Sequence, residues 1–285
     1  MSDEPPEPAP GSVPVQSGSA ELLADADRPG GWLLLVDRIR QSYVDLDDPT
    51  YLDFEYLQML ADVLDALPPG PLAVVHVGGG AFTFPRYVGA TRPGSAQIAF
   101  EPDAALSALV RARLPLPRRL RLKIRPVNGR DGVCGLPSSS ADVLVLDAYL
   151  GGRVPGELTT VEFFADAARV LRPGGVVLGN LADGPPLHYT RRVVATVRSA
   201  LPHAVLVADP AVVRGRRFGN VVLAASAAAL PLRAVQRAAA GAAFPRTVLH
   251  GDSLTRFAGG VRQLTDANPA RSPQPPDELW RVGEA

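Results

Sequence analysis

Cysteine and lysine are almost absent from this sequence of 285 residues, which contains one of each, Cys134 and Lys123. A single cysteine excludes an internal disulfide and a cysteine-rich metal site, and it is typical of a reducing compartment. A single lysine excludes most mechanisms that proceed through a Schiff base. We therefore expect a cytoplasmic protein that depends on neither disulfides nor thiolate-bound metal.

Net charge and long hydrophobic runs are also missing. Lys plus Arg and Asp plus Glu both number 29, so no global field favours nucleic acid or an anionic membrane. The longest apolar run, 221–232, is short of the roughly 18 to 20 residues that cross a bilayer. The N-terminus shows no basic segment followed by an apolar one, so we expect no secretory signal. We expect a small-molecule substrate, no nucleic acid and no membrane.

The 4 histidines, residues 76, 188, 203 and 250, lie far apart in the sequence. None has the spacing of a metal-ligand motif, so we expect no metal site. His76 is part of an apolar run, and we interpret it as a core histidine with a hydrogen-bonding partner.

The composition divides the chain into four parts. Residues 1–31 are rich in Pro, Gly, Ser, Ala and acids, and we expect a disordered tail. Residues 32–66 contain two short strand-like runs and a helical stripe within 51–67, which predicts a small N-terminal β unit and a linking helix. Residues 67–243 form the main domain, and 244–285 are a C-terminal extension.

Strand and helix patterns alternate through the main domain, which predicts an α/β fold with one mostly parallel sheet. The runs 204–207 and 220–224 are too close for a helical crossover and should form an antiparallel hairpin. We therefore predict a Rossmann-like methyltransferase fold whose seven-stranded sheet ends in that hairpin. The expected strands are 72–77, 96–101, 120–127, 142–147, 175–181, 203–208 and 217–225, and the expected helices are 83–90, 103–113, 160–171 and 187–200.

Three glycines, Gly78, Gly79 and Gly80, follow the first strand of this sheet. Such a turn supplies positive φ and a backbone without Cβ, which lets a nucleotide approach the amides. Glu101 ends the next strand 23 positions after Gly78, near the roughly 20 expected for the acid that binds ribose hydroxyls. Asp147 ends a third apolar run. Either acid has an ordinary alternative as a helix N-cap or a solvated loop residue.

At this point the sequence resembles the spermidine synthase family, the polyamine aminopropyltransferases with a Rossmann-like methyltransferase fold. The resemblance covers roughly residues 32 to 225. The matching segments are Gln41-Ser42, Tyr56, Val77-Gly78-Gly79-Gly80, Phe100-Glu101-Pro102-Asp103, Asp142-Val143-Leu144-Val145-Leu146-Asp147, Val161-Glu162-Phe163-Phe164 and Leu171-Arg172-Pro173-Gly174-Gly175.

The resemblance implies roles for these residues. Asp147 would be the catalytic base, and Tyr56 the tyrosine on the substrate side. The donor, decarboxylated S-adenosylmethionine, would lie on the glycine loop with its ribose on Glu101 and its adenine near Asn128 and Gly129. Gln41 is a further family position on the donor side. The resemblance also implies a polyamine acceptor such as putrescine and a homodimer.

The sequence departs from the family at several charged positions. Ala81 stands where an acid follows the glycines, Leu150 stands where the second acid of the catalytic loop is expected, and Leu57 and Gln58 replace His and Glu. These changes remove charge from the place of a dicationic acceptor. Other acids are candidates to replace them, namely Asp53, Glu55, Asp183 and Glu157.

The sequence leaves three functions open. An aminopropyltransferase leads, and a methyltransferase that uses S-adenosylmethionine itself is favoured by Ala81. A catalytically silent family member would act as a binding protein. An NAD-dependent enzyme fits less well, because the glycines are contiguous and not spaced as G-x-G-x-x-G.

Overall fold

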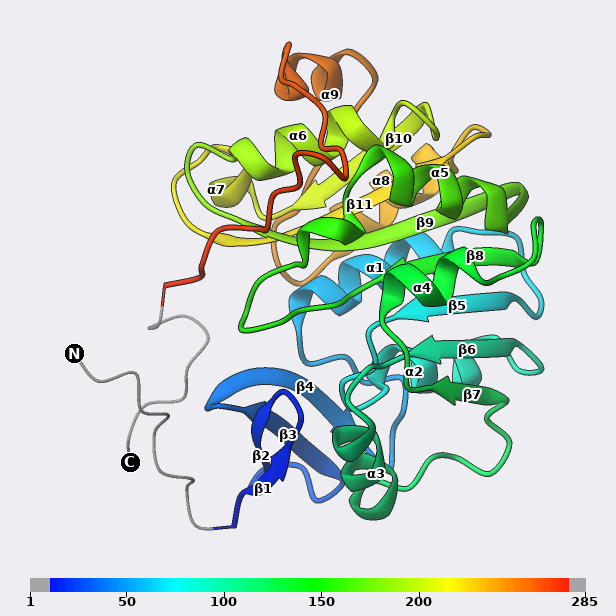
Figure 1. The fold of residues 1–285 in the computed structure, drawn as a ribbon, viewed down its shortest axis with the longest axis vertical. Coiled ribbons are helices and arrows are strands. Elements are labelled where there is room, and N and C mark those ends of the chain that lie inside the picture. Colours follow the sequence, from blue (N-terminus) through cyan, green and yellow to red (C-terminus); the bar gives the residue numbers. More distant parts are fainter. Residues whose placement is uncertain (1–10, 277–285) are drawn as a thin grey trace.

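The computed structural model describes residues 11–276, which form two β-sheets flanked by helices (Figure 1). The larger, sheet B, has eight strands in the order β12-β10-β11-β9-β8-β5-β6-β7. The smaller, sheet A, has the order β1-β2-β3-β4. No helix in this part of the chain is both long and apolar enough to cross a membrane.

Sheet B contains all seven strands that the sequence predicts. Strands β7, β6, β5, β8 and β9 pair in parallel, and β10 and β11 form the expected antiparallel hairpin, with β11 against β9. The fold class is therefore confirmed, but the sheet has eight strands and not seven, and it ends in β12 beyond the hairpin. The bounds are β5 Ala73–Val77, β6 Ala96–Phe100, β7 Leu122–Arg125, β8 Ala141–Leu146, β9 Leu171–Asp183, β10 His203–Ala208 and β11 Gly219–Ser226.

Helices cover both faces of sheet B because its strands are apolar on both sides, as parallel strands usually are. Helices α4, α5, α6 and α9 pack on one face and α1, α2 and α8 on the other. The bounds are α1 Glu55–Asp65, α2 Thr83–Thr91, α3 Ala104–Arg113, α4 Gly129–Cys134, α5 Val161–Val170, α6 His188–Val197, α7 Pro210–Val213, α8 Leu232–Gly241 and α9 Gly251–Ala258, with a 3-10 turn η1 at Gly156–Leu158.

The expected disorder of residues 1–31 is wrong for residues 11–31, while residues 1–10 lie outside the described part. Two strands form there, β1 Val13–Val15 and β2 Gly18–Ala24, and β2 pairs with β3 Gly31–Val36, which pairs with β4 Ile39–Asp45. Composition alone misses them because β1 is held by its ladder with β2, and β2 by its ladder with β3 and by burial of Ala20, which is 0% exposed.

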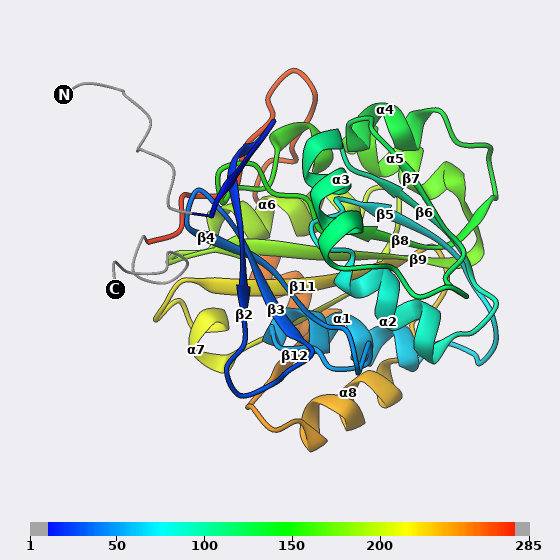
Figure 2. The ribbon, with the colours of Figure 1, turned by 90° about the horizontal axis from the view of Figure 1, so that it is seen from below.

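Sheet A packs against the β6–β7 side of the main domain (Figure 1), beside α3 (Figure 2). Leu34 and Val44 of sheet A share an apolar cluster with Phe82 and Leu106. The Ser17 hydroxyl and amide both donate to Asp103, at 2.6 and 2.7 Å. Sheet A is thus fixed to the main domain, next to the carboxyl ends of β5 and β6.

The predicted boundary at residue 243 is also wrong, because the C-terminal extension completes the main sheet. Strand β12 Thr247–His250 pairs with β10 as the eighth strand, and α9 packs on the same core. Farther on, the Ser272 hydroxyl accepts from the Val154 amide at 2.8 Å, which ties the extension to the segment between β8 and η1. Phe244 is exposed, Phe257 packs on the core, and Trp280 lies outside the described residues.

Gly78 directly follows β5, and its backbone lies close to the end of the neighbouring strand β8. Its φ is +99°, and a Cβ there would lie 2.1 Å from the backbone oxygen of Asp147. β5 and β8 are neighbours, yet the chain continues from β5 to β6 on the other side. Their carboxyl ends thus form the switch point where open α/β sheets bind ligands.

We predict that Gly78→Ala destabilises the protein by about 3 kcal/mol or more, because positive φ and backbone overlap act together. Gly174→Ala is the matched control, since Gly174 has φ +81° and no atom within 4 Å of the place where a Cβ would lie. It should lose only about 1 kcal/mol. Urea unfolding measures both. Equal losses would show that the contact with Asp147 does not constrain this turn.

Candidate functional site

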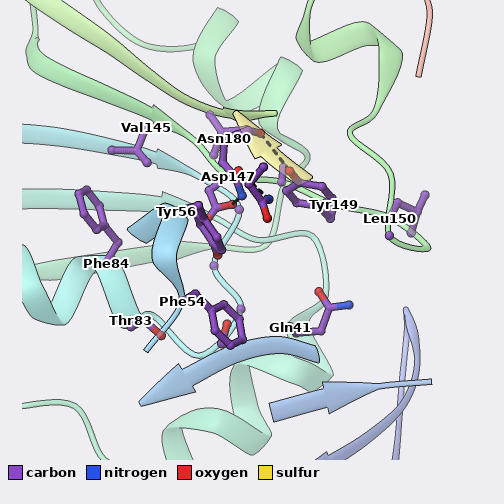
Figure 3. A pocket seen from close by; sticks show the side chains of 18 of the residues that line it. Gln41, Phe54, Tyr56, Thr83, Phe84, Val145, Asp147, Tyr149, Leu150 and Asn180 are labelled. Carbon is purple, nitrogen blue, oxygen red and sulfur yellow. Dashed lines mark hydrogen bonds between the residues drawn. The ribbon is translucent and has the colours of Figure 1, made fainter. Parts of the chain in front are cut away.

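A cavity of about 630 Å³ opens at the switch point, where the glycine loop, the end of β8 and sheet A meet (Figure 3). Of the site residues predicted from the sequence, Gln41, Tyr56, Glu101, Asn128 and Asp147 all line it. Gly78, Gly79, Gly80 and Gly129 line it as well. Residues far apart in the sequence thus come together in one place.

Glu101 closes the glycine loop from the end of β6. Its carboxylate accepts hydrogen bonds from the amides of Gly79 and Gly80, at 2.9 and 3.4 Å, and from that of Asp103, at 3.0 Å. Burial raises the pKa of Glu101, and these backbone donors lower it in part. The alternative of a helix N-cap does not apply, because Asp103 caps α3 by accepting from Leu106.

Ala81 does not face the cavity. It is 0% exposed and packs in the cluster beneath sheet A, and its amide donates to the Ser42 hydroxyl at 3.1 Å. Phe82 follows with φ +57°, a left-handed conformation in a bulky residue, and its ring is fully buried. The missing acid at position 81 is therefore weaker evidence about the donor than the sequence suggests.

Asn128 and Gly129 begin α4 at the edge of the cavity. The Asn128 side chain caps this helix, accepting from the Asp131 amide at 2.8 Å and donating to its carboxylate at 2.7 Å. A side-chain carbonyl has two lone pairs, so one acceptor position remains for a ligand. A Cβ on Gly129 would lie 2.2 Å from Val77, which explains the glycine.

Asp147 lies at the end of β8 and points into the cavity. Its two oxygens accept from Asn180 Nδ2 at 2.9 Å and from the Tyr56 hydroxyl at 3.1 Å. Burial raises the pKa of Asp147, and the bonds from Asn180 and Tyr56 lower it in part. Burial also raises the pKa of Tyr56 well above its usual value, so this hydroxyl stays protonated.

Further polar residues that hold Asp147 are not predicted from the sequence. Asn220 of β11 donates to Asn180 Oδ1 at 3.0 Å, which orients the Asn180 amide so that its nitrogen faces Asp147. The Tyr149 hydroxyl donates to the main-chain carbonyl of Asn180 at 3.2 Å. Figure 3 shows Tyr56, Asn180 and Tyr149 gathered around Asp147. The one feature of the sequence that could have indicated this role is the polar Asn180 within the apolar strand β9.

The candidate replacement acids divide into two groups. Asp53, Glu55 and Glu157 line the cavity but are exposed. Asp183 is buried and accepts from the amides of Gly184 and Thr190, both at 2.8 Å, so it is a structural residue outside the cavity lining. The sequence thus offers four acids, but the side-chain donors that hold Asp147 are Asn180 and Tyr56.

His76 is a core residue, as interpreted from the sequence. It is 2% exposed, and its Nε2 lies 2.8 Å from Gln97 Oε1. Burial lowers the pKa of His76 to about 4, so the ring is neutral near pH 7. This histidine provides no charge to the site.

The fold and the site together define a class: a Rossmann-like α/β fold of the methyltransferase type, with a mostly parallel sheet, the antiparallel β10–β11 hairpin and a carboxylate at the switch point. No family model matches the chain. A polyamine aminopropyltransferase of Chromobacterium violaceum is 30% identical over 145 residues, which is 50% of this chain and 55% of the relative. The match thus spans about half the length of that relative.

A solved structure covers far more of the chain. A probable spermidine synthase of Corynebacterium glutamicum is 30% identical over 91% of this chain and 97% of its own, with a TM-score of 0.84. The chain belongs to the spermidine synthase family, a family of transferases. A spermidine synthase in complex with the transition state analogue AdoDATO shares the fold at 19% identity and a TM-score of 0.61, over 78% of this chain and 75% of that one.

Asn180→Ala should raise the pKa of Asp147 by about 1 to 2 pH units, because a hydrogen bond to a charged group contributes roughly 1.5 to 3 kcal/mol. Asn220→Ala keeps the Asn180 donor and should raise it less. Carboxyl ¹³C NMR titration of Asp147 measures both. An unchanged pKa in Asn180→Ala would mean that Asn180 does not stabilise the ionised carboxylate.

Proposed function

We propose that this protein transfers the aminopropyl group of decarboxylated S-adenosylmethionine to an amine, with putrescine as the reference acceptor. The observation that carries the proposal is the position of Asp147: a half-buried carboxylate, held by Asn180 and Tyr56, in the same cavity as the glycine loop. Membership of the spermidine synthase family supports it.

The chemistry suits these residues. The amine nitrogen attacks the carbon next to the sulfonium, a C–N bond forms, and the C–S bond breaks with its electron pair going to sulfur. The leaving group is a neutral thioether, so no acid is needed. An amine is mostly protonated near pH 7, and a base must take its proton before it attacks. Asp147 is that base, because burial raises its pKa.

The donor would use the residues on the β5–β6 side of the cavity. The glycine loop would face its aminopropyl group, the remaining lone pairs of Glu101 would accept from the ribose hydroxyls, and Gly129 leaves room for the base beside Asn128. Gln41 reaches the same cavity from β4 of sheet A. The AdoDATO complex of a protein with this fold is consistent with such a ligand.

We expect decarboxylated S-adenosylmethionine to raise the melting temperature more than S-adenosylmethionine does, because a ligand of the folded state stabilises it by mass action. Differential scanning fluorimetry with matched concentrations of the two nucleosides makes the comparison. A larger shift with S-adenosylmethionine would favour a methyltransferase and contradict the proposed donor.

Asp147→Asn should reduce the rate of methylthioadenosine release by about 10² to 10⁴-fold, the usual contribution of a general base. The folded-state pKa of Asp147 is raised, so its ionised form opposes folding at neutral pH. The variant should therefore be at least as stable at pH 7, and this advantage should disappear below about pH 4, where the carboxyl is protonated in both states.

Tyr56→Phe is the companion variant, and it should slow release less because only one hydrogen bond to Asp147 is lost. Chromatography of the released nucleoside measures the rates, and thermal unfolding shows that each variant is folded. A folded Asp147→Asn variant with the native rate would exclude Asp147 as the base.

A further inference from the structure

A diamine acceptor has a second ammonium group, and the carboxylates that line the cavity differ in whether they are free to pair with it. They belong to eight residues: Asp37, Asp53, Glu55, Glu101, Asp103, Asp147, Glu157 and Asp209. Glu101 is engaged by the glycine-loop amides, and Asp103 is engaged by Ser17 and the first turn of α3. Both belong to the donor side. Asp147 is therefore the one deep carboxylate in the described lining that is left for an acceptor.

The other five carboxylates stand at the rim or are already paired. Asp209 caps α7 and forms an ion pair with Arg217 at 3.2 Å. Asp37, Asp53, Glu55 and Glu157 are exposed. Ion pairs between exposed groups contribute only about 0 to 1 kcal/mol. The rim can thus attract an amine of any kind, but it distinguishes poorly between one charge and two.

Apolar and aromatic side chains line the cavity on either side of Tyr56, and the polar groups that contact Asp147 carry no negative charge. Toward the rim the apolar side chains include Phe54, whose ring centroid lies 5.9 Å from that of Tyr56, and Leu150, which is 55% exposed. The lining also includes Met59, Phe84 and Val145. Figure 3 shows Phe84 and Val145 on one side of Tyr56 and Leu150 on the other.

Resting on the proposed function, we propose that the acceptor is a primary monoamine with an apolar chain, and not an α,ω-diamine. The reacting nitrogen sits at Asp147, and the chain packs on the aromatic and aliphatic walls. A second ammonium placed on those walls would lose its hydration without a buried counter-charge, which is unfavourable. A methyl group at the same point gains from burial.

The reaction balances without a further reactant. The lone pair of the neutral monoamine forms the C–N bond, the C–S electrons stay on sulfur, and the products are methylthioadenosine and an N-(3-aminopropyl) alkylamine. The proton removed before attack passes to Asp147 and then to water. No oxidant or reductant is needed.

The test compares two acceptors of the same length, putrescine and n-pentylamine, in which a methyl group replaces the distal ammonium. kcat/KM for methylthioadenosine release is measured with decarboxylated S-adenosylmethionine across a pH series. We expect n-pentylamine to be preferred by about tenfold or more, as the burial of an uncompensated charge requires. A preference for putrescine of that size overturns the proposal.

A binding experiment tests this proposal separately from the proposed function. Calorimetric titration of each amine into protein saturated with methylthioadenosine needs no turnover. Tighter binding of n-pentylamine supports the monoamine site even if no aminopropyl group is transferred, in which case the proposed function alone fails. Tighter binding of putrescine overturns the monoamine site, whatever the activity.

Leu150→Asp should restore a counter-charge at the cavity wall, with Leu150→Asn as the matched control for polarity. We expect the ratio of putrescine to n-pentylamine binding to rise about two- to fivefold in Leu150→Asp relative to Leu150→Asn, since a carboxylate at this exposed position can pair with the distal ammonium and such a pair contributes up to about 1 kcal/mol. Equal ratios in the two variants overturn the proposal that a missing carboxylate sets the preference. The exposure of Leu150 makes both substitutions compatible with folding.

Discussion

The contact between Gly78 and the backbone of Asp147 is the constraint on which the site depends. No side chain fits at position 78, because its Cβ would overlap the Asp147 carbonyl. The glycine loop and the carboxyl end of β8 are therefore held against each other. In the proposed reaction, a donor on the loop and an amine at Asp147 would meet as a direct result, which is how a rigid scaffold raises the rate of a reaction between two substrates.

The orientation of the Asp147 carboxylate is fixed by a short network of hydrogen bonds. Asn220 orients Asn180, Asn180 donates to one oxygen of Asp147, and Tyr56 donates to the other. These donors stabilise the carboxylate that burial disfavours. The balance leaves a carboxylate whose pKa is raised above its usual value, in a cavity whose lining also includes the aromatic and aliphatic side chains of Phe54, Phe84 and Val145. That combination fits the proposed monoamine, whose nitrogen would lie at Asp147 and whose chain is apolar.

The sequence predicts much of this architecture but little of the support around the base. Alternating apolar runs predict all seven strands from β5 to β11, because a buried parallel strand is apolar along its whole length. They do not predict β2, whose partner lies across a turn, or β12, which is four residues long and half-buried. Glu101 and Asp147 are predictable because strand ends meet at one edge. Asn180 and Ala81 are not, because their roles depend on where their side chains point.

A crystal structure with methylthioadenosine and n-pentylamine bound tests the central claim most directly. We expect the ribose on Glu101, the sulfur at the Gly78–Gly80 loop, and the amine nitrogen about 3 Å from the Asp147 carboxylate. A nucleoside bound elsewhere, or an amine nitrogen held by other groups and out of hydrogen-bonding reach of Asp147, would contradict it.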